Sequence, residues 1–360
     1  MRDETERLVA AMGIAIQAGV PVLLWGEPGT GKSASIASVC RELGRPLETV
    51  IGSIRDATDI GGLPVRTDSG VSLVPPDWAV RSSEFGRSVI LFDELTTCAA
   101  DVQAAILSVV LERRVGSLKL PESVSFVAAA NPAGSGGFRP LSPPLANRFC
   151  HLEWVADPHA WAVAFRGGWP RPILPKVPPE RETSTRTWTD RVATFISRRP
   201  ELLQSPVHQD RSRAWASPRS WAMARHLAAA AEAACAPVDV LFLLVAGCVG
   251  HGAAVEFLAF VADDDLVDPE TALARPHDVA IPERADRCHA LLQSVVDCLG
   301  DRPTQTRWNA AWSLVARVAR VRGADAAFVA GRQLAKVRDL QWAAPEDADV
   351  FEPLLAGSTR

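Results

Sequence analysis

Apolar runs in the first 155 positions alternate with helical patterns, and this order predicts a sheet with helices packed on it. Short apolar segments bounded by glycine, proline or polar residues are typical of buried parallel strands. Five such segments are Val22–Trp25, Pro46–Ile51, Val89–Phe92, Val124–Ala130 and Cys150–Val155. Helical spacing of apolar residues is found in Asp3–Ala18, Lys32–Leu43 and Asp101–Leu111. The pattern predicts an α/β fold with a parallel five-stranded sheet.

Two further segments have the alternation of β-hairpins. Short arms with alternating apolar residues flank Asp68-Ser69-Gly70 within 65–73 and Gly116-Ser117 within 114–120. Turn residues of this kind between short arms predict hairpins inserted into the α/β order.

The second half of the chain is helical by its apolar spacing, apart from a proline-rich stretch at 167–189 that predicts a linker or long loop. Ser217 is a good N-cap, and Pro218 suits the first position of a helix that runs to about Cys235. Later helices are predicted at 238–248, 253–262, 269–274, 282–299, 307–321 and 324–337. We expect a core at 1–156, a linker at 157–190, a helical region at 191–280 and a helical C-terminal extension at 281–360.

Composition adds few constraints to this picture. The chain has 360 residues, of which 48% are hydrophobic, so one large or two smaller domains can be packed. The net charge of −4, without a long basic run, argues against coating of nucleic acid. Seven cysteines without a C-x-x-C pattern predict buried reduced thiols. The longest apolar run, 240–250, is too short to span a bilayer, and no signal peptide is expected, so we predict a cytoplasmic protein.

The strongest chemical signal is a glycine-rich loop between the first predicted strand and the helix after it. It follows the pattern G-x-x-x-x-G-K-S, in which backbone N–H groups and the helix N-terminus form a cradle for a polyphosphate. Lys32 is expected to reach the β- and γ-phosphates, and the Ser33 hydroxyl to bind Mg²⁺. The alternative is a flexible glycine-rich turn. The candidate nucleotide-binding residues are Gly26, Glu27, Pro28, Gly29, Thr30, Gly31, Lys32, Ser33, Ala34 and Asp93.

Two carboxylates, Asp93 and Glu94, follow a buried strand at the end that faces the ligand crevice in open α/β sheets. We expect Asp93 to hold Mg²⁺ and Glu94 to polarise the water that attacks the γ-phosphate. A helix cap is the alternative interpretation.

Asn131 and Arg148 are two further candidates near the ends of strands. The Asn131 amide follows a strand and can contact the γ-phosphate or the attacking water, although Asn131-Pro132 also suits a simple turn. Arg148 precedes the last strand of the core, where it is either a surface charge or a cation directed at the γ-phosphate of a neighbouring subunit.

Taken in order, these motifs resemble the AAA+ ATPases. Gly26–Ser33 looks like Walker A, Val89–Glu94 like Walker B, Asn131 like sensor 1 and Arg148 like the arginine finger. Ser217-Pro218-Arg219 looks like sensor 2 at the start of a lid helix. More narrowly, Asp93-Glu94-Leu95, the segments 102–107, 112–116 and 145–149, and the hairpin pair resemble the MoxR-like branch, close to the dynein-related group. The resemblance implies an AAA+ core, an all-helical lid and bound ATP and Mg²⁺.

The chain departs from that pattern in two places. Ala146-Asn147 precedes Arg148 where MoxR-like chains often have Leu-Asp, and the segment between Trp154 and Ser217 is longer than usual. In relatives with these inserts the lid is often displaced, so Arg219 acts either on its own site or on that of a neighbour. Arg219 lies in the first turn of a helix, where its charge opposes the helix dipole, and this favours a functional role. Arg139 is a further candidate for a cation that acts on a neighbouring subunit.

The resemblance implies a ring ATPase, expected to be a hexamer, in which Glu94, Asn131, Arg148 and Arg219 serve catalysis. It further implies chaperone-like remodelling of a partner protein, commonly one with a von Willebrand A domain.

Two other functions fit the same motifs. One is a nucleotide-switched scaffold in a multi-protein bacterial system, for example in defence, with slow turnover. The other is a nucleic-acid motor, which the acidic net charge disfavours although the hairpins carry Arg66, Arg113, Arg114 and Lys119.

Overall fold

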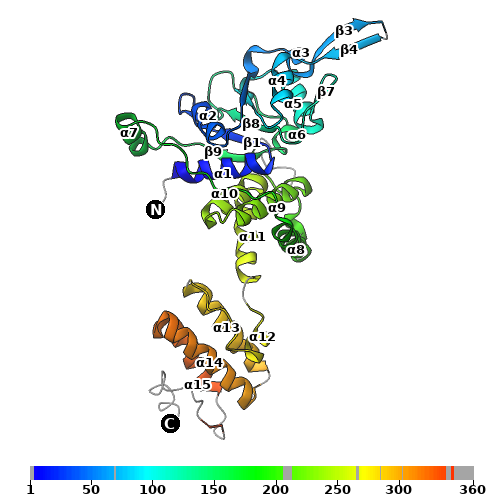
Figure 1. The fold of residues 1–360 in the computed structure, drawn as a ribbon. Coiled ribbons are helices and arrows are strands. Elements are labelled where there is room, and N and C mark those ends of the chain that lie inside the picture. The colour runs from blue at the N-terminus through cyan, green and yellow to red at the C-terminus, as the bar shows by residue number, and fades with distance from the viewer. Residues whose placement is uncertain are drawn as a thin grey trace. The chain divides into compact units, whose positions relative to one another are not determined.

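The computed structural model describes residues 4–68, 70–205, 213–264, 267–283, 285–301, 303–337 and 342–343. The chain forms two compact units, Met1–Leu258 and Ala259–Arg360, and each is described by itself. The first unit contains every strand of the described chain, and the second is built from helices (Figure 1).

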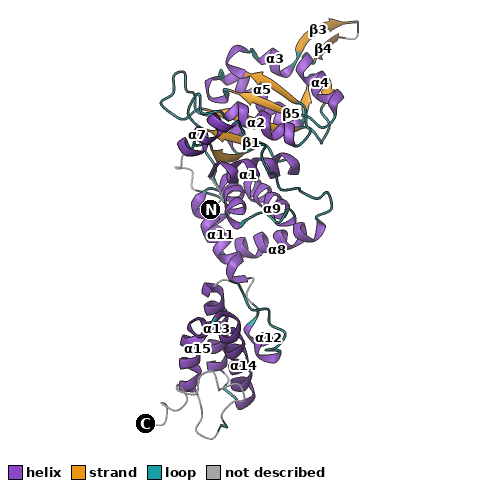
Figure 2. Cartoon of the chain, turned by 60° about the vertical axis from the view of Figure 1, so that its left-hand side comes forward, coloured by secondary structure: helices purple, strands orange, loops and turns teal. Residues whose placement is uncertain are grey.

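A parallel five-stranded sheet forms the centre of the first unit. Its strands are β1 (Val22–Trp25), β2 (Leu47–Ile51), β5 (Val89–Asp93), β8 (Ser125–Ala130) and β9 (Cys150–Glu153). The order across the sheet is β2-β5-β8-β1-β9, and Leu23 pairs with Ala128 on one side and with His151 on the other. The predicted parallel five-stranded α/β sheet is therefore confirmed, and all five strands end at the same edge (Figure 2).

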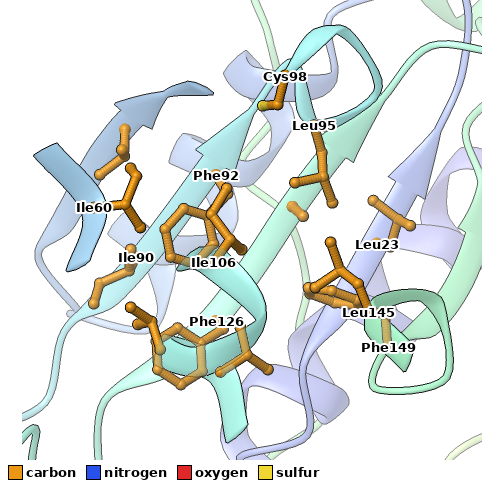
Figure 3. Close-up of a cluster of buried hydrophobic side chains, with 14 of the residues drawn as sticks. Leu23, Ile60, Ile90, Phe92, Leu95, Cys98, Ile106, Phe126, Leu145 and Phe149 are labelled. Carbon is orange, nitrogen blue, oxygen red and sulfur yellow. The ribbon is translucent and has the colours of Figure 1, made fainter. Parts of the chain in front are cut away.

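One face of this sheet carries a large apolar core. Phe92 stacks on Phe126 with ring centroids 6.2 Å apart, and Trp78 meets Phe92 edge-on at 6.3 Å. Ile106 covers these strands from above, and Leu145 closes the side near β1 (Figure 3). These side chains come from α3 (Ala57–Gly61), α4 (Asp77–Phe85), α5 (Ala100–Glu112) and α6 (Pro143–Ala146), as well as from the strands. Burial of each large side chain contributes about 1.5–3 kcal/mol, so this layer fixes the positions of the strands.

The helix α1 (Glu4–Ala18) lies against β1, β8 and β9, and it also contacts α2 (Lys32–Glu42). It further packs on α9 (Pro218–Ala233) and α10 (Val238–Val249), so it joins the sheet to the following helices. Gly247 lets α10 approach β9 closely, because a Cβ there would lie 2.5 Å from the carbonyl oxygen of His151. The helix α11 (His251–Asp264) follows directly.

Both predicted hairpins are present, as β3 (Leu63–Thr67) with β4 (Gly70–Val74) and β6 (Arg114–Val115) with β7 (Leu118–Lys119). The turn of the second hairpin is hydrogen-bonded to two elements: Gly116 N–H donates to Gly61 O at the end of α3 at 2.9 Å, and Ser117 N–H donates to Leu73 O of the first hairpin at 2.9 Å. Gly116 has φ +55°, and a Cβ there would lie 2.5 Å from Leu73 O, so a side chain would separate the hairpins.

The stretch predicted as a linker contains more structure than expected. Helix α7 (Pro158–Gly167) begins where the Asp157 side chain accepts hydrogen bonds from two backbone N–H groups, and α8 (Glu182–Arg198) starts inside the stretch at 167–189 that was predicted as a linker or long loop. Only 168–181 is free of helix, because its five prolines disfavour one. The prolines indicated a loop, and helix α7 before them was therefore not predicted.

This extended stretch is fastened to α1. The side chain of Leu174 sits over Gly13, where a Cβ would approach it to 3.0 Å. Gln17 donates to Pro175 O at 2.8 Å and accepts from Val177 N–H at 3.2 Å. The Gln17 side chain thus makes the hydrogen bonds to the backbone of this segment that a neighbouring strand would otherwise make.

The second unit is a helical bundle with its own core. Its helices are α12 (Pro269–Ala274), α13 (Ala285–Asp301), α14 (Gln305–Arg322) and α15 (Ala324–Val337). Trp308 and Trp312 are fully buried, and Trp308 Nε1–H donates to Leu334 O at 2.9 Å, so both tryptophans belong to this core. Within the described parts of the chain, every helix is too short or too polar to cross a membrane.

Gly247→Ala is expected to destabilise the first unit by about 1–3 kcal/mol, because the added methyl group must push α10 away from β9. The measurement is the free energy of unfolding by chemical denaturation. Gly252→Ala in α11 is the control, since a Cβ there has no neighbour within 4 Å. Equal stability of the two variants would contradict the close packing of α10 on β9.

Candidate functional site

The glycine-rich loop joins the end of β1 to the start of α2, as predicted. Gly29 and Gly31 have φ values of +78° and +91°, which disfavour other residues. A Cβ on Gly26 would lie 2.5 Å from the carbonyl oxygen of Trp154, so the loop also needs glycine at its start for packing. Trp154 Nε1–H donates to Thr30 O at 3.0 Å and holds the loop from the other side.

Lys32 is held inside this loop and is only 8% exposed. Its Nζ donates to Gly26 O at 2.6 Å, to Glu27 O at 3.0 Å and to Asn131 Oδ1 at 3.0 Å. Burial lowers the pKa of Lys32, and the charges of Asp93 and Glu27 oppose that shift. The loop therefore presents a positive charge next to the N-terminus of α2, a donor set that fits a polyphosphate.

Ser33 and Asp93 form an oxygen pair beside Lys32. Ser33 Oγ donates to Asp93 Oδ2 at 2.7 Å, and Glu94 N–H donates to Asp93 Oδ1 at 2.9 Å. A hydroxyl and a carboxylate so close together are the ligands that Mg²⁺ prefers, so these residues fit the predicted Mg²⁺ site.

Glu94 has an unusual backbone, with φ 59° and ψ 38° in the left-handed region. This conformation costs a residue other than glycine about 1 kcal/mol or more and turns the chain sharply after β5. The exposed Glu94 carboxylate accepts a hydrogen bond from Ser53 Oγ. Ser53 lies in the 3₁₀-helix η1 (Gly52–Ile54) after β2, and no pattern in the sequence indicates this contact.

Asn131 is fixed by a buried threonine as well as by Lys32. Asn131 N–H donates to Thr96 Oγ1 at 3.0 Å, and this hydroxyl donates to Asn131 O at 3.1 Å. Thr96 lies in the 3₁₀-helix η2 (Leu95–Thr97), directly after Glu94. Sequence reasoning missed Thr96, because a single threonine after an acidic pair has no distinctive pattern.

Arg148 and Arg219 lie together at the opposite edge of the sheet. Cys150 pairs with Val22 at the start of β1, so Arg148 precedes the strand ends that lie farthest from the loop. Its guanidinium donates to Pro144 O at 2.6 Å. Burial, and then the positive charge of Arg219, lower the pKa of Arg148. Two cations thus lie close together, and neither forms an ion pair with a described residue.

Asn147 connects these arginines to α9. Its Oδ1 accepts from the Ser217 hydroxyl at 2.9 Å and from the Arg219 guanidinium at 3.4 Å. Its Nδ2 is buried and has no hydrogen-bond partner among the described residues. Ser217 caps α9 as predicted, with Pro218 in the first turn.

Arg139 lies apart from this pair. Its backbone N–H donates to Thr96 O at 2.6 Å, so its loop runs beside η2, on the side of Glu94. Its side chain is exposed.

Trp25, the last residue before the loop, is hydrogen-bonded to His151 of the neighbouring strand β9. Trp25 Nε1–H donates to His151 Nδ1 at 2.9 Å, and His151 Nε2 lies 2.9 Å from Ala146 O. Nδ1 must be the acceptor, so the proton is on Nε2. Burial is the main cause that lowers the pKa of His151 to about 4, so the ring is neutral near pH 7. Arg213 lies over the Trp25 ring at 3.7 Å and pairs with Glu153.

Comparison with known families identifies the part of the chain that carries this geometry. Residues 21–149 match the family described as the AAA domain of the dynein-related subfamily. This segment is an AAA domain. The expected membership in the dynein-related branch is confirmed, and the AAA domain is a nucleotide-binding P-loop domain. It includes the candidate residues from Gly26 to Arg148, whereas Arg219 lies beyond the matched segment.

One solved structure similar to the chain comes from Cytophaga hutchinsonii and is named a "putative ATPase". It is 17% identical, the TM-score is 0.45, and the alignment covers 69% of this chain and 82% of the other. A comparison with curated proteins gave no match.

The pKa of His151 predicts how the stability of the first unit depends on pH. The unfolded chain binds a proton near pH 6.5, whereas folded His151 binds it only near pH 4, so stability falls as the pH drops below 6.5. Between pH 7.5 and pH 5, His151 is expected to cost the parent about 2 kcal/mol.

The matched variant is His151→Asn, whose amide oxygen can still accept from Trp25 Nε1 but does not titrate. The pKa of His226 is also lowered by burial, and its contribution is the same in both proteins. Chemical denaturation at the two pH values should give a weaker pH dependence for the variant. Parallel curves for the two proteins would contradict the neutral buried imidazole.

Proposed function

We propose that this chain binds ATP with Mg²⁺ and hydrolyses it at a site that a second copy of the chain completes. One observation carries the proposal: the phosphate loop and the arginine pair lie at opposite edges of the same parallel sheet.

The chain's own residues supply the binding half of the site. Lys32 and the N-terminus of α2 bind the phosphates, and Ser33 with Asp93 holds Mg²⁺, which neutralises charge on the phosphates when bound. Glu94 accepts the proton of the attacking water, and Asn131 orients that water. The contacts of Asn131 support this role, because Thr96 holds its backbone and Lys32 holds its side-chain amide.

The positions of Arg148 and Arg219, away from the phosphate loop of their own subunit, support a role of both residues at the site of a neighbour. The paired residues from Val22 to Trp25 alone separate the two edges by about 10 Å, and Arg148 lies further back still. A neighbour that presents this edge to the loop would bring both cations to the γ-phosphate, where they stabilise the transition state. The mutual repulsion of the two cations supports this role, because an approaching triphosphate relieves it. We thus assign Arg219, like Arg148, to the site of the neighbour.

Such a head-to-tail contact repeats around a closed ring when the rotation closes. We propose a ring, expected to be a hexamer, that remodels a partner protein in the manner of the MoxR-like group. A partner with a von Willebrand A domain is the leading candidate.

A slow nucleotide-switched scaffold is the second candidate. The Ser53 contact of the Glu94 carboxylate favours it, because this hydrogen bond must break before the same carboxylate oxygen can accept a proton from water. A very low basal rate that rises only with a partner protein would distinguish this function.

Glu94→Gln is expected to lower the rate of ATP hydrolysis by about 100-fold or more, because the amide cannot accept the proton of water. Fluorescent-nucleotide titration should show that ATP binding is retained. Glu84→Gln, an exposed glutamate on α4, is the matched control. Hydrolysis at the parental rate by the Glu94 variant would refute the assigned role.

A mixture of two inactive variants tests whether Arg148 acts between copies. Lys32→Ala should not bind ATP, and Arg148→Ala should bind ATP without hydrolysing it at more than about 1% of the parental rate. An equal mixture should recover about a quarter of the parental rate, since an intact loop meets an intact Arg148 at one contact in four.

The recovered rate should be highest when the two variants are present in equal amounts, and it should fall when either variant is in excess. No recovery, with both variants assembled in one complex, would show that Arg148 does not act on the neighbour.

A further inference from the structure

The segment of the first unit between residues 155 and 173 exposes large apolar side chains on and beside α7. We call it the α7 surface, and its residues are Val155, Trp161, Val163, Phe165, Trp169 and Ile173. Their exposed fractions range from 49% for Trp161 to 92% for Ile173. By contrast, Ala164 on the same helix is buried, so α7 touches the protein through one side only.

The size of this surface is unusual for a folded chain. Because an aromatic side chain can bury 150–250 Å², these six residues together expose on the order of 800 Å². The largest apolar patch on a typical monomer is about 300–600 Å², whereas each partner in a standard protein interface buries about 800 Å². The α7 surface therefore has the area of one side of a stable interface.

The α7 surface stands apart from the helices that cover the sheet (Figure 1). Trp161 and Phe165, one helical turn apart, stack with ring centroids 4.7 Å apart and interplanar angle 14°. Two aromatic rings held together in this way form a rigid projection, and ordering them on binding costs little conformational entropy.

Both ends of this segment are fixed to the nucleotide side of the unit. Before α7, Trp154 donates to Thr30 O in the phosphate loop and lies against Gly26. After α7, the stretch 174–177 is bound to α1 through Gly13 and Gln17. The α7 surface thus begins beside the loop that binds the triphosphate.

We infer that the α7 surface is where a second copy of this chain docks, with the edge that carries its Arg148 facing the phosphate loop. The inference rests on the proposed function, in which the site is incomplete without that second copy. Continuity with the loop, the area and the rigid aromatic pair all fit this occupant. A copy that docks here contacts the segment after Trp154, and Trp154 also binds the phosphate loop. Assembly and nucleotide binding therefore both involve this segment.

The test compares Trp161→Ser/Phe165→Ser with the control Phe85→Ser/Leu111→Ser. The control residues are both 53% exposed and lie on α4 and α5, so both double variants remove exposed apolar area. Sedimentation velocity of the full chain with ATP measures assembly. We expect the concentration for half assembly to rise at least about tenfold for the α7 variant and to stay unchanged for the control.

The direction of docking can be tested in the complementing mixture. The α7 surface lies beside the loop of the copy that binds ATP, so the α7 substitutions should abolish recovery when added to the Arg148→Ala copy. Added to the Lys32→Ala copy, they should leave most of the recovery, because that copy contributes only its arginine edge. The same loss from either copy would overturn the inference.

Further outcomes are decisive in themselves. Unchanged assembly of the α7 variant overturns the inference. If this variant assembles normally but loses binding to vesicles of anionic lipid, the α7 surface binds a membrane instead of a second copy. Circular dichroism must show that the variant is folded, and its affinity for a fluorescent ATP analogue should stay within about twofold of the parent. If the parent assembles but Glu94→Gln does not slow hydrolysis, the proposed function fails while the docking site is still judged by assembly.

Discussion

The parallel pairing of β1 between β8 and β9 is the constraint on which the rest of the structure depends. It places the phosphate loop, Asp93 and Asn131 at one edge, because parallel strands all end on the same side. It equally places Arg148 at the other edge, since that residue precedes β9. The separation of Arg148 from the phosphate loop therefore follows from the topology of the sheet rather than from any local contact.

Polar contacts then refine what the sheet positions. At the edge of the sheet that carries the phosphate loop, three hydroxyls from different elements each bind a candidate site residue. These hydroxyls are those of Ser33, Ser53 and Thr96. Such contacts between distant segments hold the acids and the amide at fixed positions, and this limits the reorganisation that a reaction requires. On the other edge, Asn147 has a comparable role for Arg219.

The sequence predicted the sheet, both hairpins and the phosphate loop, because each depends on local patterns of apolar residues and glycine. The positions of the Asp93 and Asn131 side chains followed, since strand ends are part of the same pattern. Ser53, Thr96 and Asn147 could not be predicted, because their contacts join residues far apart in the chain. Helix α7 was missed for another reason: its apolar side faces outward, and the prolines after it gave a stronger signal for a loop.

The two hairpins have a mechanical consequence. Helix α5 starts shortly after the sharp turn at Glu94, runs for 13 residues and ends at β6, so it forms a rod of about 20 Å. At its far end Gly116 N–H donates to Gly61 O of α3, and Ser117 N–H donates to Leu73 O of the longer hairpin. The shorter hairpin therefore braces the end of α5 against both α3 and the longer hairpin.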